Sequence, residues 1–145
     1  MARILVVEDN PQNLKLTTII LQSAGHTVIP AMDSSAAKRA IAAEPPDMIL
    51  MDVELPRKDG YTLTRELRVQ PETARLPIVA LSAFAMPGDA EKALDAGCTE
   101  YLTKPIRRAQ LLARVAVLLG SASAPGLRTE RPVAQRIPSS EGDPG

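Results

Sequence analysis

Short apolar runs alternate with segments of helical periodicity along most of this chain. The runs Ile4–Val7 and Met48–Met51 contain no polar position, which is typical of strands that are buried on both faces. Cap and breaker residues such as Asn10-Pro11 and Pro45-Pro46 mark where the helices begin and end. The pattern predicts strands at 4–7, 26–30, 48–51, 77–81 and 99–102, and helices at 10–25, 34–44, 61–69, 88–96 and 107–119.

Five strands that alternate with five helices predict an α/β fold. Parallel neighbours need helical crossovers, so we expect a doubly wound, five-stranded parallel sheet with helices on both faces. A hydrophobic content of 45% over 145 residues fits one domain, which we place at residues 1–120. From 121 to 145 the chain has no aromatic residue and many Pro, Gly and Ser, so we predict a disordered C-terminal tail there.

Charge and cysteine content narrow the classes of partner. Lys and Arg total 17 and so do Asp and Glu, so the chain lacks the positive field that direct nucleic-acid binding relies on. No apolar run is long enough for a membrane span or an export signal. The single cysteine, Cys98, agrees with a reducing compartment, and we expect a cytoplasmic protein.

Polar side chains follow four of the predicted strands at the point where each ends. These residues are Glu8, Asp9, Asp52, Ser82 and Lys104. Doubly wound sheets bind ligands outside the carboxyl ends of their strands, so we expect these side chains to lie close together. Carboxylates at such short range repel unless a cation lies among them, and Mg²⁺ prefers oxygen ligands and phosphate. The pattern therefore indicates a magnesium and phosphate site.

Within this site Asp52 is the candidate nucleophile, because a carboxylate can form an aspartyl phosphate. Lys104 and Ser82 are suited to hold phosphoryl oxygens as an ammonium and a hydroxyl donor. Taken singly, each residue is an ordinary turn, loop or solvated residue, and only the combination indicates chemistry.

The chain resembles the receiver domains of two-component response regulators, the CheY-like family, over residues 1 to about 120. The segments that carry the resemblance are VVEDN (6–10), ILMDVELP (49–56), ALSAFAM (80–86) and GCTEYLTKPI (97–106). The resemblance is closest to single-domain DivK-type receivers or to the receivers of hybrid kinases. It implies a flavodoxin-like sheet with strand order 2-1-3-4-5.

The resemblance also implies a role for each acid. Asp52 falls on the phosphoacceptor, Glu8 and Asp9 fall on the acidic pair that binds Mg²⁺, and the backbone carbonyl of Glu54 falls on the third protein ligand. Glutamate at position 8 departs from the more usual aspartate of the family but keeps the carboxylate.

Four further positions match the switching part of the family pattern. Ser82 and Lys104 correspond to the phosphoryl-binding hydroxyl and lysine, and Tyr101 corresponds to the aromatic switch residue. Serine at position 82 departs from threonine but keeps the hydroxyl. The resemblance further suggests a cis peptide between Lys104 and Pro105, which X-Pro bonds permit at low cost.

The implied function is a single-domain response regulator of a two-component system or phosphorelay, with switched protein–protein interactions as its output. His26 is the only histidine, so the phosphoryl group is expected from a separate histidine kinase or histidine phosphotransferase. We expect no enzyme activity beyond self-phosphorylation from small donors and self-dephosphorylation. Asn13, Leu16 and Ile20 on the first helix form a candidate docking surface for the donor, and an equally good interpretation of the two apolar residues is a wide buried stripe.

Three alternatives stay open on the sequence alone. The chain can be the receiver segment of a hybrid kinase, or a receiver that serves only as a non-switching interaction scaffold. A phosphotransferase of the dehalogenase type also uses an aspartate at a strand end, but its pattern begins on the first strand and has a second aspartate two residues later, where this chain has Glu54.

Overall fold

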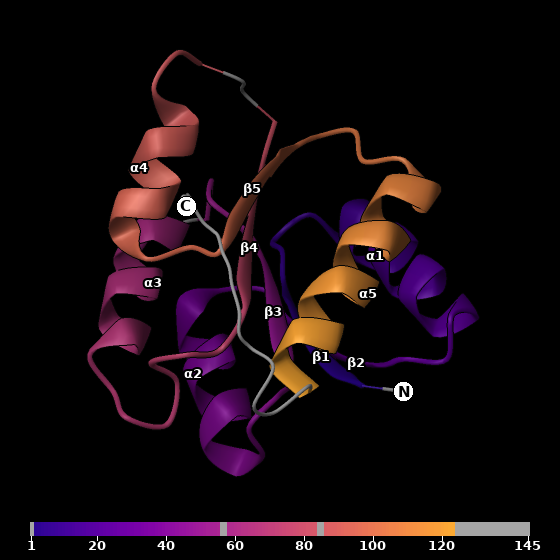
Figure 1. The fold of residues 1–145 in the computed structure, drawn as a ribbon, viewed down its shortest axis with the longest axis horizontal. Coiled ribbons are helices and arrows are strands. Elements are labelled where there is room, and N and C mark those ends of the chain that lie inside the picture. Colours follow the sequence, from indigo (N-terminus) through magenta and orange to yellow (C-terminus); the bar gives the residue numbers. More distant parts are fainter. Residues whose placement is uncertain (1, 56–57, 84–85, 124–145) are drawn as a thin grey trace. The chain divides into compact units, whose positions relative to one another are not determined.

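The computed structural model describes residues 2–55, 58–83 and 86–123, and Figure 1 shows the fold. The described residues form five strands and five helices. The strands are β1 Arg3–Val7, β2 Thr27–Ala31, β3 Met48–Asp52, β4 Ile78–Ser82 and β5 Glu100–Thr103. The helices are α1 Pro11–Ser23, α2 Ser34–Ala43, α3 Gly60–Arg68, α4 Asp89–Ala96 and α5 Arg108–Ser123.

By its internal contacts the chain divides into two units, Met1–Ala113 and Arg114–Gly145. The first unit contains the whole sheet and the helices from α1 to α4. Residues 124–145, which make up most of the predicted tail, lie outside the described part of the chain.

The sheet has the order β2-β1-β3-β4-β5, and all neighbouring strands are parallel. This arrangement confirms the predicted doubly wound fold. Val7 pairs with Met51, Asp52 pairs with Leu81, and Ser82 pairs with Thr103. This register brings the ends of β1, β3, β4 and β5 to one edge of the sheet. The polar residues that the sequence places after these strands therefore lie at that edge.

The central strands are apolar throughout because both of their faces are covered. Leu5, Val7, Ile49 and Met51 belong to one buried cluster with side chains of α2, α3 and α4. Those three helices lie on one face of the sheet and α1 lies on the other (Figure 1). The residues between these positions point to the opposite face and are also buried. Among the described residues, no helix is long and apolar enough to span a membrane.

Side-chain caps fix where α1 and α2 begin. The side chain of Asn10 accepts hydrogen bonds from two backbone N–H groups in the first turn of α1, which has Pro11 as its first residue, as predicted. The N-cap of α2 is Asp33, whose carboxylate accepts from the N–H of Ala36 at 2.7 Å. Asp33 lies one position before residue 34, where the sequence predicts that this helix begins.

Helix α3 begins against the backbone at the end of β3. A Cβ atom added to its first residue, Gly60, would lie 2.9 Å from both the carbonyl oxygen of Asp52 and the Cα of Val53. Atoms at that distance clash, so glycine is required for this close approach. The start of α3 and the end of β3 are therefore in direct backbone contact.

Candidate functional site

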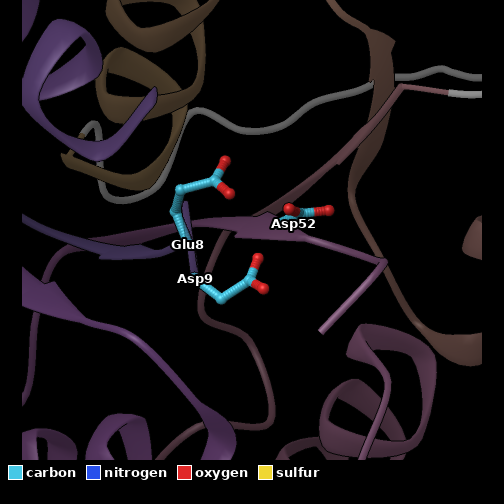
Figure 2. Close-up of side chains that lie close together, drawn as sticks. All are labelled: Glu8, Asp9 and Asp52. Atoms are coloured by element: carbon cyan, nitrogen blue, oxygen red, sulfur yellow. The ribbon is translucent and has the colours of Figure 1, made fainter. Parts of the chain in front are cut away.

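Three carboxylates gather where β1 and β3 end. Glu8 and Asp9 follow β1 directly, and Asp52 is the last residue of β3 (Figure 2). One oxygen from each carboxylate lies within 4.8 Å of the other two. Glu8 and Asp52 are each 4% exposed, whereas Asp9 is exposed to solvent. The acid cluster, as we call these three residues, therefore has two buried members and one at its open side.

Lys104 is the counter-ion of the two buried acids. Its Nζ lies 2.7 Å from Oε1 of Glu8 and 3.1 Å from Oδ2 of Asp52. Burial acts to lower the pKa of Lys104, but its hydrogen bonds to the two carboxylates outweigh this effect, and its pKa is raised. Burial, followed by the hydrogen bond with Asp52, raises the pKa of Glu8 against the opposing effect of Lys104.

The acid cluster fits a small divalent cation. Three carboxylates against one ammonium leave two negative charges when all are ionised. Mg²⁺ takes oxygen ligands at about 2.1 Å in octahedral geometry, so two of its oxygens lie about 3.0 Å apart when adjacent and about 4.2 Å apart when opposite. One oxygen from each carboxylate of the acid cluster lies within 4.8 Å of the other two, which is close to this range. The donor set and its spacing therefore suit Mg²⁺.

Glu54 links Asp52 to the end of β4. Its backbone N–H donates to Oδ1 of Asp52 at 2.8 Å. Its side chain accepts from the hydroxyl of Ser82 at 2.6 Å and from the N–H of Ala83 at 3.2 Å. The sequence indicated only the carbonyl of Glu54. The pairing of β3 with β4 places Glu54 and Ser82 at the same edge of the sheet. No sequence pattern, however, gives the direction of the Glu54 side chain, because this residue lies in a loop.

Two tyrosines meet the start of α4 beside this edge. The hydroxyl of Tyr101 donates to Oδ2 of Asp89 at 3.4 Å, and the hydroxyl of Tyr61 donates to the backbone oxygen of the same residue at 3.5 Å. Burial, followed by the negative charge of Asp89, raises the pKa of Tyr61 to about 12. The sequence indicated Tyr101 but not Tyr61 or Asp89.

The Lys104–Pro105 peptide bond is cis.

The candidate docking residues on α1 do not share one surface. Asn13 is exposed and Leu16 is 57% exposed, but Ile20 is buried at 8%. Ile20 is therefore not available to a partner. The prediction that Ile20 belongs to the docking surface is wrong. Ile19, at 52% exposure, is the second exposed apolar residue of this helix. It lies three positions after Leu16, so the two are neighbours on the helix surface.

Comparison with known proteins gives a consistent result. The family model of the response regulator receiver domain matches residues 4–116. Over 119 residues the chain is 34% identical to the polar-differentiation response regulator DivK of Brucella anthropi, which covers 82% of this chain and 97% of DivK. Over 114 residues the chain is 40% identical to the response regulator PleD of Caulobacter vibrioides. That alignment covers 79% of this chain but only 25% of the length of PleD.

A solved structure extends the similarity to three dimensions. The receiver domain of the sensor histidine kinase PA1611 from Pseudomonas aeruginosa aligns with a TM-score of 0.77 and 43% identity, covering 83% of this chain and 98% of that domain. That structure has a magnesium ion coordinated in its active site cleft.

Proposed function

This chain belongs to the response regulator receiver domain family, and from that premise we propose that it is a phosphoacceptor switch whose acceptor is Asp52. Receiver domains serve two-component systems as phosphoacceptors and are generally not classed as enzymes. One observation carries the assignment: Asp52, Glu8, Asp9 and Lys104 meet at the carboxyl edge of a parallel sheet.

In the proposed reaction an oxygen of Asp52 attacks the phosphorus of a phosphohistidine on a histidine kinase or histidine phosphotransferase. A P–O bond forms and the P–N bond of the donor breaks, with its electron pair returning to the ring nitrogen. Lys104, beside Oδ2 of Asp52, neutralises negative charge there, and Ser82 and the N–H of Ala83 donate to phosphoryl oxygens. Water later attacks the phosphorus, releases inorganic phosphate and restores the carboxylate.

We assign Mg²⁺ to the carboxylates of Glu8, Asp9 and Asp52 together with the backbone carbonyl of Glu54. The spacing of the acid cluster supports this assignment. When bound, the ion neutralises the acids and the phosphoryl oxygens, which otherwise repel.

The proposed output is binding to a downstream protein. Phosphorylation draws Ser82 towards the phosphoryl group, Tyr101 repacks, and the surface formed by α4 and β5 changes. The contact between Tyr101 in β5 and Asp89 at the start of α4 supports this route, because it joins the two elements whose surface would change.

The extent of the regulator is part of the proposal. We propose a single receiver domain at residues 1–120, a tail at 121–145 and a cytoplasmic location. The match to 97% of the length of DivK supports a single-domain organisation. The free, buried thiol of Cys98 agrees with a reducing compartment.

Incubation with a small phosphodonor and Mg²⁺, followed by intact mass measurement, tests the proposal. We expect one added phosphoryl group in the wild type and none in Asp52→Asn. Equal labelling of the two proteins would show that Asp52 is not the acceptor. Sustained turnover of added phosphoesters would instead favour a phosphotransferase of the dehalogenase type.

For the phosphodonor we propose a docking surface on α1 that contains Asn13 and Leu16. Leu16 is exposed on the helix that follows Glu8 and Asp9 in the chain, and an exposed leucine on a helix is suited to pack against a helical partner. We expect Leu16→Ser to slow phosphotransfer from the cognate donor at least about tenfold, the loss typical of an anchoring residue. Labelling by a small phosphodonor should be unchanged.

Leu94→Ser is the matched control, because Leu94 is similarly exposed at 54% but lies on α4. Equal transfer rates to wild type, Leu16→Ser and Leu94→Ser would disprove the docking surface.

A further inference from the structure

The carboxylate of Glu54 occupies two hydrogen-bond donors at the end of β4. Its Oε2 accepts from Oγ of Ser82 at 2.6 Å and its Oε1 accepts from the N–H of Ala83 at 3.2 Å. An ionised carboxylate has no proton to donate, so the serine hydroxyl must be the donor in the shorter contact. Both oxygens of Glu54 are therefore engaged by the segment that follows β4.

The two ends of this contact are held in place. The backbone N–H of Glu54 is bonded to Oδ1 of Asp52, which fixes the start of the Glu54 side chain next to the acceptor. Ser82 is 1% exposed, and its carbonyl accepts from the N–H of Lys104 at 2.8 Å. The contact between Glu54 and Ser82 thus joins two anchored positions, one of which is bonded directly to the carboxylate of Asp52.

We propose that Glu54 is an internal competitor of the phosphoryl group, a proposal that rests on the proposed function of Asp52. Carboxylate and phosphoryl oxygens are both anionic acceptors, and they seek the same hydroxyl and the same N–H. These donors cannot serve both groups at full strength. The Glu54 side chain therefore stabilises the unphosphorylated state and must leave Ser82 and Ala83 before they bind the phosphoryl group.

The surroundings of Glu54 favour its present position. Beside it lies a surface depression of about 420 Å³, and Asp59, Tyr61 and Asp89 are among the residues that line it. Two of these residues are acids, so their like charge opposes movement of the Glu54 carboxylate into this depression. This repulsion favours the contacts of Glu54 with Ser82 and Ala83.

Affinity for beryllofluoride, a small mimic of the phosphoryl group on a carboxylate, tests the competition. The full chain is titrated by calorimetry at saturating Mg²⁺ as wild type, Glu54→Ala and Glu54→Asp. We expect Glu54→Ala to bind about tenfold more tightly or better, the gain expected when a charge-assisted hydrogen bond no longer has to be broken. Glu54→Asp should also bind more tightly, because it keeps the charge but is one methylene too short to reach both donors.

Ser82→Ala supplies a second arm. In that background the main donor is absent, so the gain from Glu54→Ala should shrink several-fold. A readout without metal or phosphoryl mimic is the amide resonance of Ala83, which should shift in Glu54→Ala because its carboxylate acceptor is gone.

The outcomes separate this proposal from the proposed function. If the wild type binds no beryllofluoride, or binds it as well after Asp52→Asn, the assignment of the acceptor fails. If the wild type binds it through Asp52 but Glu54→Ala binds no more tightly, the competition is overturned. Tighter binding by Glu54→Ala with unchanged binding by Glu54→Asp would also overturn it, because charge rather than contact would then explain the gain.

Discussion

Replacing Asp52 with asparagine should stabilise the metal-free protein. Asparagine keeps the shape of the side chain, and its amide oxygen can still accept from the N–H of Glu54, but it carries no charge. The change therefore isolates the electrostatic balance of the acid cluster. The sign of the effect depends on which charges around Asp52 dominate.

The distances allow this balance to be worked out. At an effective dielectric constant of about 20, the 3.1 Å separation from Lys104 corresponds to about 5 kcal/mol of attraction. Glu8, at no more than 4.8 Å, contributes about 3.5 kcal/mol of repulsion or more on the same scale. Asp9 is exposed, so water screens its repulsion to about 1 kcal/mol. The attraction and the repulsion nearly cancel.

Burial then decides the result. Asp52 is only 4% exposed, and removing a carboxylate from water costs several kcal/mol. Part of that cost is offset by the hydrogen bond from Glu54. We therefore expect Asp52→Asn to raise the free energy of unfolding by about 1–2 kcal/mol, which corresponds to about 3–6 °C in Tm for a domain of this size.

Thermal melts at pH 8 in the presence of a chelator measure this difference, with Asp95→Asn on the exposed surface of α4 as the matched control. Added Mg²⁺ should also raise the Tm of the wild type. At a hundred times its Kd the ion adds about 2.7 kcal/mol to the free energy of unfolding. The Tm of Asp52→Asn should rise much less. Equal melting of metal-free wild type and Asp52→Asn would refute the crowding of acids.

Two further predictions concern neighbouring groups. Lys104→Met should lower the free energy of unfolding by about 3 kcal/mol at pH 8, because it leaves Glu8 and Asp52 buried without a counter-ion. The raised pKa of Glu8 means that its protonated form is favoured in the native state. The loss of unfolding free energy caused by Lys104→Met should therefore shrink as the pH falls from 8 towards 5. Urea titrations that give the same loss at both pH values would contradict this. Tyr61, with a pKa raised to about 12 against an ordinary value of 10, should contribute stability that is complete below pH 10 and is lost between pH 10 and 12. Absorbance titration of Tyr101→Phe, in which Tyr61 is the only tyrosine, should have its midpoint near pH 12, and a midpoint near 10 would disprove the effect.

The sequence predicted the sheet and the acid cluster well because both depend on backbone order alone. A buried parallel strand such as β3 must be apolar throughout, and the residue after it must emerge at the ligand edge. The position of Asp52 at the ligand edge therefore follows from the sequence pattern alone. The alternation of strands and helices was likewise sufficient to predict the doubly wound architecture.

The face of α1 could not be predicted in the same way. Apolar residues occur at 14, 16, 19, 20 and 21, so they surround much of the helix and select no single stripe. The predicted docking surface includes Ile20 and not Ile19, but Ile20 is buried at 8% and Ile19 is 52% exposed. Contacts of loop side chains, such as that of Glu54 with Ser82, depend on rotamers that no periodic pattern encodes.

The absence of a side chain at Gly60 also limits where this molecule can change shape. Because the first turn of α3 lies against the backbone of Asp52 and Val53, this helix and the acceptor strand must move as one body. The first residue of α4, Asp89, lines the depression beside Glu54. The N-cap of this helix, Gly88, makes no side-chain hydrogen bond, and the contacts of Asp89 with the two tyrosines are long, at 3.4 and 3.5 Å. Because α3 is held against the acceptor strand and the start of α4 is weakly held, we expect structural change that begins at Asp52 to travel towards α4.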